Sequence, residues 1–172
     1  MVITEILKYT IPSLILFLTV YYILHSYFYD QDKKRQYKGM LKNKELIIPV
    51  RLQAYERIIL FLERISPDSL IMRVSEPGMT CQQLQTEMIA SIRAEFEHNL
   101  SQQLYLSPDA WVYVKNARAN TLKMIHLAAE KIPANAPYMQ LSAALLDLSV
   151  QEEKTPSGLA IEFLKKEVHK LF

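Results

Sequence analysis

The fold is decided by the stretch SPDAWVYVKNARANTLKMIHLAAEKI, which occupies residues 107–132. Ser107 can cap the free N–H groups of a helix, Pro108 suits the first helical position, and Asp109 complements the positive end of the helix dipole. Apolar residues then recur at intervals of three and four, which is the spacing of one helical face. This stretch therefore predicts a long amphipathic helix.

Similar start signals occur on both sides of it. They are Ser66-Pro67-Asp68, Thr155-Pro156, and the capping-box pattern of Thr80 with Gln83. Together with the apolar periodicity they predict helices at about 46–65, 67–74, 81–104, 108–131, 137–150 and 156–171, with Pro49 marking the start of the first. The chain has only three Gly, which argues against a turn-rich β sandwich. We therefore expect an all-α protein, in which residues 45–172 form a compact bundle of about five helices.

Residues 9–29 contain no Asp, Glu, Lys or Arg. As a helix this stretch would measure about 31 Å, close to the thickness of the hydrocarbon core of a bilayer. The sequence that follows it does not suit a signal peptidase, which favours an uncleaved anchor. The sequence therefore predicts an N-terminal transmembrane helix, with residues 1–29 as membrane anchor, 30–44 as basic juxtamembrane linker and 45–172 as helical domain.

Charge is unevenly distributed along the chain. Residues 30–44 carry six Lys or Arg and two Asp, whereas residues 45–172 carry 13 basic and 15 acidic side chains. Positive residues beside a span favour its cytoplasmic side, so we expect the inner membrane, an external N-terminus and a cytoplasmic domain. A basic cluster of this kind can serve only to set the topology of the span. The alternative hypothesis is that four of its residues bind the headgroups of membrane lipids: Lys33, Lys34, Arg35 and Lys38.

Signatures of catalysis are absent from the sequence. Cys81 is the only cysteine, and there is no glycine-rich phosphate loop, nucleophile elbow or H-E-x-x-H motif. We therefore expect no cofactor, no catalytic residues and no evident small-molecule substrate, and the net acidic domain argues against nucleic acid. Glu95 and His98 form one E-x-x-H step, a weak candidate for a metal site because helical di-iron proteins need a second copy.

A charged stripe follows the first helix of the domain. Glu56-Arg57 is repeated seven residues later as Glu63-Arg64, and Arg51 precedes both. A solvated face explains such a stripe. The alternative is a surface that binds a protein partner or another copy of the chain, since a seven-residue repeat sets a register against a second helix. The aromatic stretch from Tyr105 to Trp111 is the next candidate surface, although core packing also explains it.

Several stretches resemble a family of small, uncharacterised bacterial single-span proteins. They are RLQAYERI at residues 51–58, FLERI at 61–65, IRAEFEHN at 92–99, QQLY at 102–105 and SPDAW at 107–111. This resemblance implies an anchor followed by a helical domain. It implies no activity and no site residues.

These observations favour a non-enzymatic, membrane-anchored interaction module, an accessory subunit of an inner-membrane assembly. One alternative is a helical-bundle, metal-dependent enzyme that uses Glu95 and His98. Another is a sensor of anionic lipid surfaces that uses the basic linker.

Overall fold

A computed structural model describes residues 2–151 and 154–171, and the side chains of residues 14–26, 45–151 and 154–170. Its elements are α1 (Val2–Arg64), α2 (Pro67–Val74), α3 (Cys81–Asn99), the 3-10 helix η1 (Leu100–Leu104), α4 (Pro108–Glu130), α5 (Tyr138–Gln151) and α6 (Pro156–Leu171). The described residues contain no strand beyond one isolated bridge between Thr80 and Pro137. The all-α class and the helical bundle are thus confirmed.

The chain divides into two compact units, Met1–Ile48 and Pro49–Phe172. In the first unit, the side chains of residues 14–26 are exposed on every side of the helix. Many of them are large and apolar: Leu16 is 69% and Tyr22 76% exposed.

The predicted transmembrane helix at residues 9–29 must be corrected. Across the part of the chain that was searched, which is the described part, none of the helices combines the length and the apolar character needed to cross a membrane. Of the predicted span, the structure describes the side chains of residues 14–26. The side chains of residues 9–13 and 27–29 lie outside those described.

The basic linker also lies outside the described side chains. It includes Lys33, Lys34, Arg35 and Lys38, and α1 continues through these positions. Lipid contact by these residues stays a prediction. So do the orientation and localisation, which rested on the membrane span.

The first helix begins much earlier than predicted. Pro49 was expected to mark its start, but α1 runs from Val2 through Pro49 to Arg64. A proline inside a helix has no N–H to donate, so the carbonyl of Glu45, four residues earlier, lacks its usual backbone partner at this point. The chain therefore tolerates a local loss of one hydrogen bond at the residue where the second unit begins.

The helix starts of the second unit follow the predicted chemistry at three places. The Ser107 hydroxyl accepts a hydrogen bond from the Ala110 N–H at 3.0 Å, and the Thr155 hydroxyl accepts one from Gly158 at 3.1 Å. Thr80 and Gln83 form both bonds of the capping box. Each cap of this kind contributes about 1 kcal/mol to helix stability.

Ser66 departs from this pattern. Its hydroxyl caps no N–H of α2 and instead donates to the carbonyl of Glu63 at 2.8 Å, at the end of α1. The serine thus helps to terminate one helix and does not use its side chain to start the next. Pro67 still occupies the first turn of α2, as predicted.

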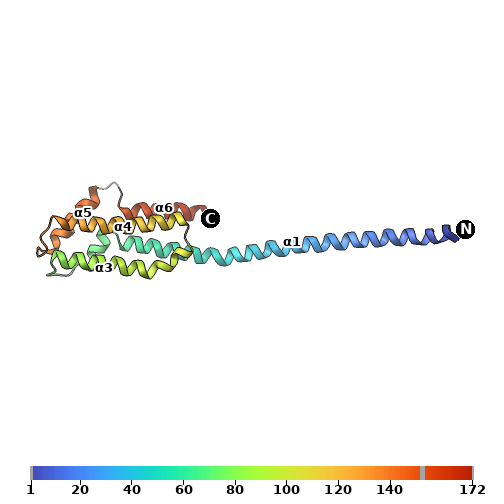
Figure 1. Ribbon diagram of the computed structural model, residues 1–172, viewed down its shortest axis with the longest axis horizontal. Coiled ribbons are helices and arrows are strands. Elements are labelled where there is room, and N and C mark those ends of the chain that lie inside the picture. The colour runs from blue at the N-terminus through green and yellow to red at the C-terminus, as the bar shows by residue number, and fades with distance from the viewer. Residues whose placement is uncertain (1, 152–153, 172) are drawn as a thin grey trace. The chain divides into compact units, whose positions relative to one another are not determined.

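In the second unit the helices lie side by side and enclose one core (Figure 1). Its largest fully buried side chains come from α1, α2, α3, α4 and α5 and from the residue that follows α1: Tyr55, Ile58, Phe61, Leu62, Ile65, Leu70, Leu84, Met88, Ile92, Ile125, Leu141 and Leu145. Burying each large aliphatic side chain contributes about 1.5–3 kcal/mol. Trp111 lies at the edge of this core, partly buried and stacked on Phe96 with ring centroids 5.6 Å apart.

Candidate functional site

The second unit presents one exposed face of α1, formed by Gln53, Glu56, Arg57, Leu60, Glu63 and Arg64, which we term the α1 charged face. These residues are exposed because the other side of the same helix enters the core, with Ile58, Phe61 and Leu62 at most 1% exposed. The spacing of three and four residues places all six on one side of a helix. Leu60 is 62% exposed among these polar side chains.

The two edges of this face carry opposite charge. At about 100° per residue, Glu56 and Glu63 lie about 40–60° to one side of Leu60, and Arg57 and Arg64 lie about 40–60° to the other. Among the ion pairs of the described residues, none involves Glu56, Arg57 or Glu63. These three side chains are therefore free to pair with groups outside the unit.

Arg64 is engaged within the unit. Its Nη2 lies 3.0 Å from Glu95 Oε1, and Arg73 Nη1 lies 2.9 Å from the same oxygen. Arg73 also donates to the carbonyl of Arg64 at 3.2 Å, which ties α2 to the end of α1. Because two guanidinium groups share one carboxylate, this triad keeps a net charge of +1, and the Arg64 side chain remains 53% exposed.

The Arg64–Glu95–Arg73 triad includes Glu95, which was a candidate metal ligand. The Glu95 carboxylate already forms ion pairs with two arginines, so a metal ion would have to displace them. His98 is exposed, and its Nδ1 lies 3.1 Å from the carbonyl of Ala94 on its own helix. No cluster of three or more His, Cys, Asp or Glu side chains placed to hold a metal ion occurs within the described residues. The arrangement fits a structural ion-pair cluster better than a metal centre.

Arg51 is also turned inward, against the expectation that it belongs to the partner surface. It is partly buried, and its Nε donates to the carbonyl of Tyr105 at 3.1 Å, so it links α1 to the joint after η1. Tyr55 lies beside it, 1% exposed. Burial raises the pKa of the Tyr55 phenol above 10.0, the Ser107 backbone opposes this effect, and the Glu167 carboxylate adds to it.

The aromatic stretch from Tyr105 to Trp111 mainly serves packing. Trp111 and Phe96 stack, the rings of Phe61 and Phe96 are tilted with centroids 5.9 Å apart, and the guanidinium of Arg118 lies 4.2 Å from the centre of the Phe96 ring. Such aromatic and cation–π contacts stabilise the core edge by about 0.5–1.5 kcal/mol each. Leu104 and Tyr105 remain exposed beside this cluster.

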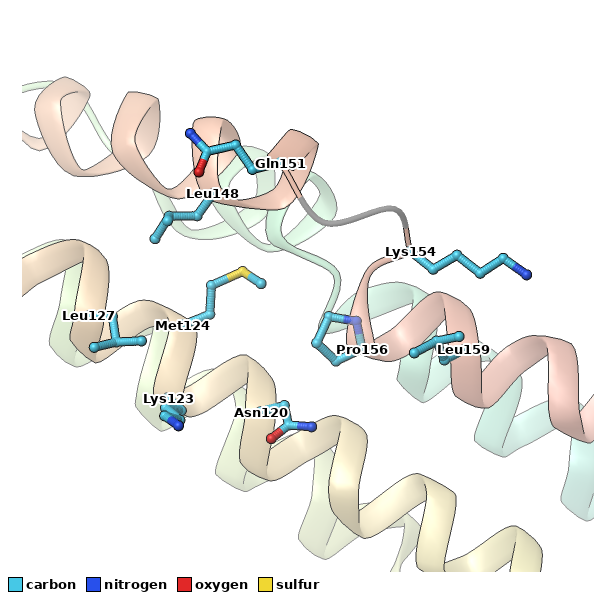
Figure 2. Close-up of a pocket in the computed structure, with 9 residues that line it drawn as sticks. All are labelled: Asn120, Lys123, Met124, Leu127, Leu148, Gln151, Lys154, Pro156 and Leu159. Atoms are coloured by element: carbon cyan, nitrogen blue, oxygen red, sulfur yellow. The ribbon is translucent and has the colours of Figure 1, made fainter.

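Sequence reasoning missed an apolar groove between α4, α5 and α6 (Figure 2). It consists of two adjoining cavities of about 480 and 420 Å³, which share Leu127 and Leu148. Figure 2 shows the side chains of Met124 and Leu148 extending toward each other across the gap, while the Lys154 amino group points away from it. Leu159, on α6, is 47% exposed at the groove. Periodicity alone cannot separate the edge of a helical stripe from its centre.

The groove offers mainly hydrophobic contact. Its polar side chains are Asn120, Gln151 and lysines at the rim in one cavity, and Glu130, Lys131 and Asp147 in the other.

Fold and surface together define an all-α protein with a helical-bundle unit and a charged helix face. A family model described as a family of unknown function (DUF7935) matches residues 1–171, and the chain belongs to this family. This agrees with the resemblance to an uncharacterised family; the bacterial origin and single span that the resemblance implied are not part of what the match shows. Neither the curated proteins nor the solved structures contain a match to the chain.

Proposed function

We propose that this protein is a non-enzymatic interaction module, and that its α1 charged face binds a protein partner. The observation that supports this proposal best is Leu60, a large apolar side chain 62% exposed between two Glu-Arg pairs. An exposed leucine alone is common on protein surfaces. A leucine flanked by four charges, of which Glu56, Arg57 and Glu63 take part in no ion pair of the described residues, however, has the composition of a small interface with an apolar centre and a polar rim.

The charges of this face are suited to specificity. Arg57 is exposed, and its planar guanidinium can pair with a carboxylate through two parallel hydrogen bonds. Glu56 and Glu63 can accept from a partner's basic side chains in the same way. Charges at an interface mainly steer association and exclude wrong partners, so reversing one of them weakens binding without disturbing the fold.

The enzymatic alternative is weaker because Glu95 pairs with Arg64 and Arg73. The lipid-sensor alternative rests on the linker, whose side chains lie outside those described.

Affinity purification of the full chain in mild detergent, followed by quantitative mass spectrometry, tests the proposal. The variant Arg57→Glu is compared with Lys115→Glu, which makes the same charge reversal at an exposed site of α4. We expect Arg57→Glu to lose a protein, or a second tagged copy of the chain, that Lys115→Glu retains. If both variants retain every protein that the unmodified chain captures, the α1 charged face is not the binding surface.

A further inference from the structure

We infer that the partner of the α1 charged face is a second copy of this chain, bound in parallel about a two-fold axis that runs along the helices. This inference rests on the proposed function and deepens it by naming the partner. It follows from how the charges are arranged about Leu60.

A two-fold axis parallel to two packed helices places each residue beside its own counterpart. Leu60 then meets Leu60 of the second copy at the axis, and Gln53, one heptad earlier and about 20° away around the helix, meets its counterpart in the same way. The same operation turns the acidic edge of one helix toward the basic edge of the other.

The heights of the charges match this arrangement. Glu56 and Arg57 differ in height by only about 1.5 Å, and so do Glu63 and Arg64. In the parallel pair each Glu56 therefore faces the second copy's Arg57, and each Glu63 faces the second copy's Arg64. All four contacts join opposite charges.

The antiparallel pair fails the same test. Its two-fold axis lies across the helices, so the acidic edge of one copy meets the acidic edge of the other, and the basic edges also meet. Like charges then face each other along both edges, which disfavours association. The distribution of charge thus selects one of the two symmetric arrangements.

The pairing of Arg64 within the unit supports the inference. Arg64, Arg73 and Glu95 together keep a net charge of +1 on the basic edge, and Arg64 remains 53% exposed. Glu63 of the second copy can neutralise that charge. Because these pairs lie at a solvent-exposed edge around one leucine, we expect a weak association that high salt reverses.

Cysteine crosslinking of the full chain tests the geometry. Gln53→Cys and Leu60→Cys are each oxidised mildly and compared with Ala119→Cys, an exposed site on α4, while the native Cys81 is only 3% exposed. We expect disulfide-linked dimers at positions 53 and 60 but not at 119, and several-fold fewer at 53 when Arg57→Glu is added. An antiparallel pair centred on Leu60 would separate the two copies of residue 53 by about 21 Å, so a dimer at 60 alone overturns the inference. Equal crosslinking at all three sites also overturns it, because it indicates non-specific contact.

Complementary charge reversals test the partner. Arg57→Glu makes both residues of the pair acidic and Glu56→Arg makes both basic, so each variant alone should lose self-association. An equimolar mixture of the two should regain it, because each acidic pair then faces a basic pair. Failure of the mixture to associate overturns the inference. If the full chain never self-associates but Arg57→Glu loses a different captured protein, this inference fails and the proposed function stands; if Arg57→Glu loses nothing, both fail.

Discussion

The two sides of α1 between Pro49 and Arg64 differ completely in their surroundings, although they alternate along one stretch of chain. Arg57 is exposed, and Ile58, the next residue, is fully buried. The buried side contributes to folding through the area that it removes from water. The exposed side contributes little to folding because water and salt already satisfy its charges. Residues that are neighbours in sequence can therefore be changed with opposite consequences for stability and for binding.

The largest expected difference between the two sides lies between the neighbours Phe61 and Leu60. Phe61 is 1% exposed and contacts the Phe96 ring at 5.9 Å, whereas Leu60 is 62% exposed. Phe61→Ala should lower the free energy of unfolding by about 3–5 kcal/mol, because it leaves a cavity in the core. Leu60→Ala should change it by less than about 0.5 kcal/mol. Urea titration followed by circular dichroism measures both, and similar losses for the two variants would contradict the comparison.

The Arg64–Glu95–Arg73 triad is the place where the exposed side of α1 also contributes to folding, because it joins Arg64 to α2 and α3. Glu95→Gln removes the charge that two guanidinium groups share and leaves them facing each other. We expect a loss of about 1–2 kcal/mol in the free energy of unfolding, since the carboxylate is mostly buried but Arg64 is half exposed.

Glu97→Gln is the matched control, because Glu97 is exposed on the same helix and belongs to none of the ion pairs of the described residues. It should have almost no effect on urea unfolding. Equal effects of the two variants would mean that the triad contributes nothing specific.

A smaller effect is expected at a charge cluster away from α1. Lys154 and Lys166 both hydrogen-bond to the Glu162 carboxylate, and this lowers its pKa from 4.5 to about 2. A depressed folded-state pKa means that the stabilisation is fully present above pH 4.5 and is lost as the pH falls toward 2. The cluster is exposed, so salt should weaken it.

A carbon-13 NMR titration of the Glu162 carboxyl group measures this directly. At low salt its pKa should lie well below 4.5, and it should rise toward that value in molar salt or in Lys154→Gln. A pKa that stays near 4.5 at low salt would refute the lysine contacts.

The fold was predictable because its signals are local. Ser107 and Thr80 cap their helices through their own side chains, and the spacing of Ile58, Leu62 and Ile65 defines a buried face without knowledge of its partner. Pro49 misled the prediction because a proline that starts one helix and a proline inside a longer one have the same neighbours in sequence.

The candidate site was only partly predictable. Glu56, Arg57 and Glu63 lie on the exposed side as expected, because seven-residue spacing fixes them relative to the apolar stripe. The contacts of Arg51 and Arg64 within the unit were not predicted, because their partners, Tyr105 and Glu95, are distant in sequence. Contacts of that kind depend on how helices pack, which no local pattern records.

The free energy of unfolding of Arg57→Glu tests the central claim most directly, because this residue lies on the exposed side beside the buried Ile58. If the two sides of α1 have separate roles, the variant should unfold within about 0.5 kcal/mol of the unmodified chain, while Phe61→Ala, measured in parallel, loses several times more. A loss of about 2 kcal/mol or more for Arg57→Glu would show that the charged side is part of the folding core, and would contradict the account.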